Sequence, residues 1–201
     1  MRIARYVVVF GLLSLGLLLG ACSGLTQSNI PANTSWWLEP FEGPGVGVPA
    51  EKPTRVTLSV TVVPGLDSNR ILTLSEDAQL NRYSAARWAD NLPELVTSLV
   101  ARTMNMSGRF DVGSAASRRQ GPGDCTLRLE VEKFFAELNV SGKTTGVRVA
   151  VNGDYQCAAD VAAAIDLSSS VPVHSERMSV IVAAFQEAMD EVMAALLVQV
   201  Q

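Results

Sequence analysis

The cysteine at position 22 has the setting most specific for chemistry in this chain. Cys22 follows Leu19-Gly20-Ala21, at the end of a segment that carries Arg2 and Arg5 and then an uncharged run rich in valine and leucine. A positive start, an apolar middle and small residues before a cut are the parts of a secretory signal. Cleavage there would make Cys22 the first residue of the mature chain. The sequence therefore predicts a signal peptide over residues 1–21 and a modified Cys22.

The motif at 19–22 resembles the signals of bacterial lipoproteins. The resemblance implies a diacylglyceryl thioether on the Cys22 sulfur and an acyl chain such as palmitate on its amino group. Several acyl chains anchor a protein stably, because each buried methylene contributes about 0.8 kcal/mol. Ser23 rather than aspartate favours the outer membrane of a two-membrane bacterium, with the folded part facing the periplasm.

A single transmembrane helix is the alternative for this segment. Residues 6–25 carry no charge, and about 20 apolar residues span a bilayer. The small residues around Cys22 and the lack of a basic cluster after them favour the signal peptide.

The other two cysteines, Cys125 and Cys157, predict a disulfide. Two strand patterns flank Ser141-Gly142, and a hairpin that turns about Ser141 sets Cys125 opposite Cys157. Facing residues of an antiparallel pair come close enough for a disulfide, which an oxidising periplasm allows. Two reduced core cysteines are the alternative. The same register places Arg128 opposite Asp154, a pair of opposite charges. It also matches the apolar positions of the two strands, in the pairs Leu127–Tyr155, Leu129–Gly153, Val131–Val151 and Phe135–Val147.

Side chains for catalysis or metal binding are scarce. His174 is the only histidine, so a Ser-His-Asp arrangement would have to include it, and a histidine-rich zinc site is excluded by count. Gly43, Gly45 and Gly47 lie in a proline-rich stretch without a strand before them or a helix after them, which is not a dinucleotide-binding pattern. We expect a protein that is not an enzyme and has no metal site and no cofactor other than the lipid on Cys22.

The charge balance bears on the partners. The whole chain has a formal net charge of −4, and loss of Arg2 and Arg5 with the signal makes the mature chain more acidic. Nucleic acid is therefore not an expected partner.

The predicted organisation is an acylated tether over 22–54 followed by a periplasmic domain over 55–201. The tether is rich in serine, asparagine, proline and glycine. Trp36-Trp37-Leu38 interrupts it and indicates a short strand near 35–41 on the edge of the domain; an exposed patch that binds a membrane or a partner is the alternative.

The domain pattern is typical of a two-layer α+β sandwich. Alternating apolar residues predict strands over 55–63, 70–74, 79–84, 110–112 and 161–167, in addition to the hairpin. A helix is expected after Asn91, which would cap it together with Glu94, and should stop at Gly108. An apolar stripe predicts a second helix over 176–198. We expect a mostly antiparallel sheet covered by these two helices.

Three short motifs resemble those of the ABC-type transport auxiliary lipoproteins, the PqiC-like family. They are Val63-Pro64-Gly65-Leu66-Asp67, Arg70-Ile71 and Arg87-Trp88-Ala89-Asp90-Asn91-Leu92. Their order, from about Trp36 to Val198, carries the likeness. The resemblance implies an adaptor that works with an inner-membrane ABC transporter or MCE-domain protein in moving lipids or hydrophobic solutes, and a ring-forming homo-oligomer.

Candidate docking residues are Trp36 and Trp37, and Leu66, Asp67 and Arg70 in the following loop. Two other functions stay open. A lipid carrier would hold an acyl chain in a cavity lined by Met104, Met106, Phe185 and Met189. A hydrolase would use His174.

Overall fold

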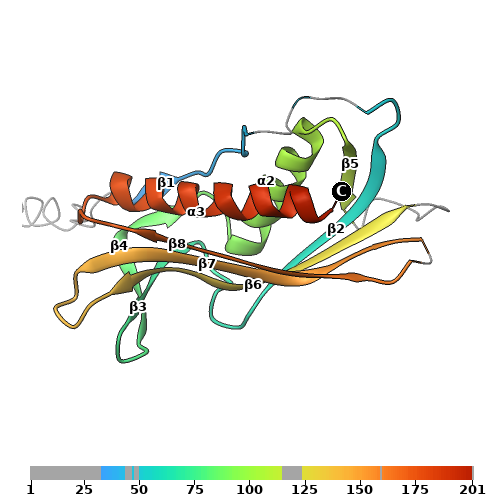
Figure 1. Cartoon of the computed structure of the whole chain (residues 1–201). Coiled ribbons are helices and arrows are strands. Elements are labelled where there is room, and N and C mark those ends of the chain that lie inside the picture. The colour runs from blue at the N-terminus through green and yellow to red at the C-terminus, as the bar shows by residue number, and fades with distance from the viewer. Residues whose placement is uncertain (1–32, 44–46, 48–49, 115–123, 159, 201) are drawn as a thin grey trace, which may run out of the picture. The chain divides into compact units, whose positions relative to one another are not determined.

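The structure is a computed structural model that describes residues 33–43, 47, 50–114, 124–158 and 160–200 (Figure 1). The expected signal peptide and Cys22 lie outside the described residues. Asn33–Gln201 forms one compact unit.

Within the described residues, this unit consists of two helices and one sheet. The helices are α2 (Leu92–Met106) and α3 (Met178–Gln199). The strands of the 8-stranded sheet are β1 (Thr34–Trp36), β2 (Thr54–Val62), β3 (Arg70–Ser75), β4 (Leu80–Trp88), β5 (Phe110–Ser114), β6 (Cys125–Leu138), β7 (Thr144–Cys157) and β8 (Ala163–Pro172). The predicted α+β class with two main helices is confirmed.

The sheet is mixed, and β6 lies at its centre. On one side, β6 pairs with β7, and β7 with β8, all antiparallel. On the other side, β2 runs parallel to the first half of β6 and β3 runs parallel to its last residues. β5 lies beyond β2, while β4 and then β1 lie beyond β3. β2 and β3 lie one after the other along the same edge of β6, and both run in the direction of β6.

Hydrogen bonds within the β6–β7 turn fix the hairpin register. The Asn139 Oδ1 accepts hydrogen bonds from the backbone N–H groups of Ser141 and Lys143, and Gly142 adopts φ +74°, a conformation that glycine tolerates. The predicted pairs from Cys125–Cys157 to Val131–Val151 are confirmed, including Arg128 opposite Asp154 with 2.9 Å between Nη1 and Oδ2.

A β-bulge after Val131 makes one predicted pair wrong. Beyond it, Phe135 faces Arg148 rather than Val147, and a second irregularity near Leu138 restores the original register. Without the bulge, the charged Lys133 would point towards the core. The bulge leaves Lys133 exposed and turns Phe134 inward instead.

One face of the sheet carries the core. Along β6 and β8, buried residues alternate with exposed ones. α2 packs on β2 and β5, and α3 packs on β7 and β8; Figure 1 shows α3 running along β8. Between the layers, Trp88, Phe134 and Phe185 form an aromatic cluster whose ring centroids lie 4.9 to 5.6 Å apart.

The element ends differ from the predictions at several places, among them the start of α2 and the end of β8. Asn91 is the N-cap of α2 but makes no side-chain capping bond. The Leu92 N–H is instead bound by the Ser68 carbonyl, which the sequence pattern could not reveal. β8 also continues through Ser168–Ser170 to Pro172, because its buried residues keep alternating beyond Leu167 up to Val171.

The packed domain begins earlier than residue 55. β1 pairs with β4, Leu38 is fully buried, and the N–H groups of Gly47, Ala50 and Thr54 bind the carbonyls of Met106, Gly108 and Arg109. The expected tether over 22–54 is therefore wrong for the described residues from Asn33 onward, since apolar side chains and backbone N–H groups among them find partners on the domain. The predicted strand near 35–41 is shorter, and residues 37–41 continue as irregular chain.

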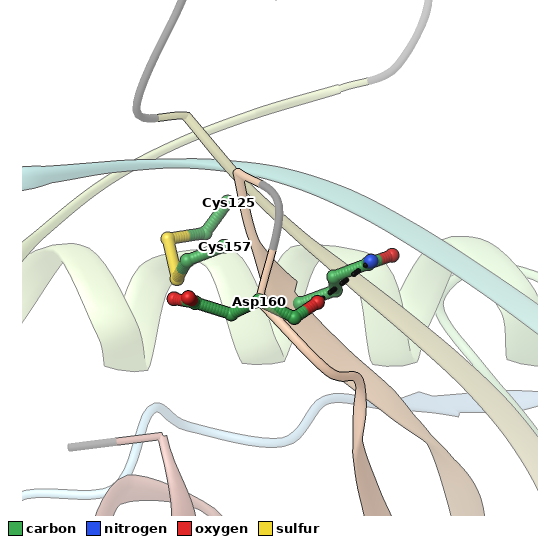
Figure 2. The surroundings of a disulfide bond; sticks show 4 residues. Cys125, Cys157 and Asp160 are labelled. Atoms are coloured by element: carbon green, nitrogen blue, oxygen red, sulfur yellow. Dashed lines mark hydrogen bonds between the residues drawn. A yellow bond between two sulfur atoms is a disulfide. The ribbon is translucent and has the colours of Figure 1, made fainter.

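Cys125 and Cys157 form the predicted disulfide, with an S–S distance of 1.99 Å (Figure 2). It joins the first residue of β6 to the last of β7. Beside it, the Asp160 N–H binds the Cys157 carbonyl. At the same end, Arg55 Nη2 lies 2.8 Å from Asp124 Oδ1.

Gly153 allows the close approach of β7 to β6. A Cβ built there would lie 1.9 Å from the backbone oxygen of Arg128, whereas one at Gly146 would lie 3.1 Å from the oxygen of Val171. We expect Gly153→Ala to lower the free energy of unfolding by at least about 2 kcal/mol through strain, and Gly146→Ala to lower it less. Urea titrations of the two variants measure the difference; equal losses would contradict the close approach.

Removal of the disulfide should weaken the domain without changing its fold. The two cysteines are 32 positions apart in the sequence, and for a loop of this length the chain-entropy model gives about 3 to 4 kcal/mol. We expect the Cys125→Ala, Cys157→Ala double variant to lose about this much in urea unfolding. A reductant should destabilise the parent protein and leave the variant unchanged, which separates bond loss from altered packing.

Candidate functional site

The described residues offer little for catalysis. In these ranges, no group of three histidine, cysteine or acidic side chains could hold a metal ion. His174 is exposed in the segment before α3, and within the described part of the chain its side chain makes no hydrogen bond or ion pair. The hydrolase alternative therefore gains no support from the placement of His174.

Hydroxyl and carboxyl groups form a hydrogen-bond network beside the start of α3. The Glu176 carboxylate accepts hydrogen bonds from the Thr144 N–H and hydroxyl, and the Tyr83 hydroxyl lies 2.7 Å from Thr144 Oγ1. Burial raises the pKa of Tyr83 above its usual range, and burial also raises that of Asp190. These hydrogen bonds join Tyr83 on β4 and Thr144 on β7 to the segment that precedes α3.

The residues expected to line a lipid cavity do not do so. Met104, Phe185 and Met189 are fully buried in the core, and Phe185 stacks on Phe134. Met106 is 39% exposed near the end of α2. The expected cavity between sheet and helices is therefore absent at these residues.

The segment around Trp36 is tied to both helices. The Glu39 N–H binds the Gln186 side-chain oxygen on α3, and the Gln186 amide nitrogen returns a hydrogen bond to the Glu39 carbonyl. The Phe41 N–H binds Thr103 Oγ1 on α2. With Leu38 in the core, these bonds fix the position at which the chain joins the domain.

Trp37 is the exposed aromatic residue of this segment. Its side chain is 41% exposed, and the Arg102 guanidinium carbon lies 4.9 Å from its ring centroid. Arg102 Nη2 also donates to the Leu38 carbonyl at 3.0 Å. An exposed ring held by a cation is suited to binding, because little side-chain freedom remains to be lost. Trp36 instead is partly buried against the core.

The sequence did not single out Arg102. Its signal is faint: α2 carries only one other charged residue, Glu94. Arg102 lies about two turns after that glutamate. Its position in the helix does not by itself predict that it would contact the ring of Trp37.

The candidate docking residues between Leu66 and Arg70 differ in their exposure. Leu66 is 4% exposed and belongs to the core cluster, so its side chain is packing. Asp67 is exposed and Arg70 half-buried. The structure thus separates Leu66 from the residues that could meet a partner, and a contact at Asp67 or Arg70 stays a prediction.

A shallow apolar groove of about 390 Å³ lies beside α2. Its walls come from the outer side of α2 and from β2 and β5, with Val60, Ala101 and Val112 among the lining residues. We did not predict this groove from the sequence. Its strand residues come from β2 and β5, and the sequence pattern does not show that these two strands pair in parallel.

None of the helices in the described part of the chain is long and apolar enough to cross a membrane.

Comparison with known proteins gives a family and a fold. Comparison with curated proteins finds no match. A crystal structure of an uncharacterized protein matches with a TM-score of 0.64 at 13% identity, and the match covers 85% of this chain and 99% of the other chain. A Xanthomonas campestris protein of the DUF330 family has a TM-score of 0.63 at 20% identity and covers 84% and 92%. Residues 41–196, most of the sequence, match one family, and the chain belongs to the family described as the ABC-type transport auxiliary lipoprotein component.

Proposed function

We propose that this chain is a non-enzymatic adaptor lipoprotein of an envelope transport system that moves lipids or hydrophobic solutes. Acyl chains on Cys22 hold it to the outer membrane, and its domain faces the periplasm. The partner is an inner-membrane ABC transporter or an MCE-domain protein. The observation that carries the proposal is the match of residues 41–196 to a transport auxiliary lipoprotein family, together with the signal pattern that ends at Cys22.

The early start of the packed domain supports work close to the membrane. Position 33, where the packed unit begins, follows Cys22 by eleven residues. In any conformation, eleven residues span at most about 40 Å. The first strand of the domain therefore lies within that distance of the acyl anchor, and the partner has to reach it there.

Trp37 is the docking residue that the geometry favours. Aromatic residues and arginine are enriched at binding hot spots, and Trp37 stacks with Arg102 at an exposed position. It lies in the segment next to the anchor. Attachment to the membrane raises the local concentration of the partner, so a small contact is enough.

The anchor is tested by two substitutions in the full chain. We expect Cys22→Ser to abolish acylation and to remove the protein from outer-membrane fractions. Ser23→Asp is the matched control, because it keeps the cysteine and should move the acylated protein to the inner membrane. Mass spectrometry of the N-terminal peptide and membrane fractionation measure both effects. An outer-membrane location of Cys22→Ser would refute anchoring at this residue.

Docking is tested by cross-linking in intact cells and mass spectrometry. We expect the parent protein to cross-link to a protein with MCE or ABC-transporter domains, and Trp37→Ala to lower the yield several-fold without changing the melting temperature. Val161→Ala removes a more exposed apolar side chain elsewhere on the domain and should leave the yield unchanged. A full yield with Trp37→Ala would move the docking site elsewhere, and the absence of any transport partner would contradict the adaptor function.

A further inference from the structure

The turn between β6 and β7 presents an apolar side chain at its tip. Val140 lies in this turn and is 89% exposed. The turn has a fixed shape, because Asn139 Oδ1 accepts hydrogen bonds from the backbone N–H groups of Ser141 and Lys143. Single exposed apolar residues are common on protein surfaces, so the position of Val140 in the molecule decides what it can contact.

The direction of β1 shows from which end the chain joins the domain. β1 runs parallel to the last residues of β4, with Thr34 opposite Ala86. Followed backwards, β1 therefore points towards the start of β4 at Leu80. Leu80 pairs with Leu74, and Leu74 pairs with Glu137 near the end of β6. The start of β1 thus points to the end of the sheet at which β6 turns into β7 (Figure 1).

The other end of the β6–β7 hairpin is far from this turn. Both strands have 14 residues, so at about 3.3 Å per residue the hairpin is about 46 Å long. Thr144 begins β7 beside the turn, and Cys157 ends β7 at the disulfide. Val161 follows Cys157 closely in the sequence, before β8 begins. Val140 and Val161 therefore mark opposite ends of the hairpin.

The proposed attachment to the membrane brings the β6–β7 turn close to lipid. Cys22 precedes Asn33, the first residue of the packed unit, by eleven positions, and eleven residues span at most about 40 Å. Because β1 points towards the β6–β7 turn, this turn is the end of the hairpin nearer to the anchor. An apolar side chain that projects from it is placed to reach the lipid headgroups.

The charges around Val140 suit a lipid surface that carries both signs of charge. Lys143 in the same turn is exposed, and so are Glu76 and Asp77 in the turn between β3 and β4. The two turns are neighbours, because β3 pairs with the last residues of β6. A headgroup such as phosphatidylethanolamine offers a phosphate to the lysine and an ammonium group to a carboxylate. A strongly anionic surface would repel the two acidic residues.

We propose that the β6–β7 turn rests on the membrane that holds the acyl anchor, with Val140 among zwitterionic lipid headgroups and Lys143 at a phosphate. The inference rests on the proposed anchor at Cys22 and adds an orientation to it. The end of the hairpin with the disulfide and Val161 points away from the membrane.

A contact of this size is sufficient because the protein is already attached. The acyl chains keep the domain at the surface, so the second contact forms within one assembly and needs little affinity of its own. Removal of the exposed Val140 side chain from water is favourable. The fixed shape of the turn means that little chain entropy is lost when the turn meets the surface.

The two exposed valines form a matched pair for a test in the full acylated chain. Val140 is 89% exposed and Val161 is 94% exposed. Val140→Cys and Val161→Cys are each labelled with the fluorophore NBD. The label goes only to the new thiol, because Cys125 and Cys157 are bonded to each other and Cys22 carries lipid in the proposed function.

The labelled proteins are placed in vesicles of phosphatidylethanolamine and phosphatidylcholine. The label of Val140→Cys should emit at shorter wavelength than that of Val161→Cys, and a lipid with a spin label on its headgroup should quench it several-fold more. Equal quenching at the two positions, or stronger quenching at Val161→Cys, would overturn the proposal. A wavelength shift at Val140→Cys without quenching would indicate a contact between protein molecules and would overturn it as well.

Val140→Asp tests whether this side chain makes the contact. With the label at Ser141→Cys, Val140→Asp should lower the quenching several-fold, whereas Val161→Asp should not change it. Exchange of phosphatidylcholine for phosphatidylglycerol should also lower the quenching, since Glu76 and Asp77 then meet an anionic surface. Unchanged quenching in Val140→Asp would overturn the role of Val140, and unchanged or stronger quenching with phosphatidylglycerol would overturn the zwitterionic surface.

Flotation of the vesicles separates this inference from the proposed anchor. Protein that floats with the vesicles but shows no preference for the label at Val140→Cys would overturn the orientation and leave the anchor intact. Protein that does not float would overturn both. The vesicles contain no transport partner, so the outcome does not depend on one.

Discussion

The pairing of β6 along both of its edges is the constraint on which the rest of the structure depends. β6 meets β7 over its whole length, while β2 and β3 share its other edge. Its bulge has to occur where the inward-facing residues change from Val131 to Phe134, because Phe134 completes the aromatic cluster with Trp88 and Phe185. That cluster joins β4 and α3 to the central strand. The disulfide holds the far end of the same hairpin closed.

Local signals in the sequence were enough for the hairpin, both helices and the disulfide. Alternation, a turn at Ser141-Gly142 and two cysteines at matching positions all indicate one register. The Phe135–Val147 pair was wrong because a bulge adds one residue, and its cause, the burial of Phe134 against Trp88 and Phe185, lies in segments far along the chain. The parallel neighbours of β6 were unpredictable for the same reason. Nothing in β2 or β3 themselves indicates that both border one strand.

The sequence indicated which segment holds the candidate site, but not which of its side chains are exposed or what they contact. Two adjacent tryptophans mark the segment, yet only the structure shows Trp36 packed and Trp37 exposed. The proline and glycine content of residues 40–53 is typical of a linker, but composition does not report the hydrogen bonds that α2 and the turn after it offer to the N–H groups of Phe41, Gly47 and Ala50. Arg102 belongs to the candidate site only because it lies over the Trp37 ring. Leu66 is buried in the core and is therefore not a docking residue.

The way the chain joins the domain also determines how the fold would bear mechanical force. A pull on the chain before Asn33 acts first on β1, whose three residues pair with β4. It next meets the paired hydrogen bonds of Gln186 with Glu39 and the buried side chain of Leu38. These contacts would rupture in sequence before tension reached the long ladder of β6 and β7. When a membrane-anchored protein is pulled from its N-terminal side, the first residues of the domain would thus detach while the pairing of β6 with β7 stays intact.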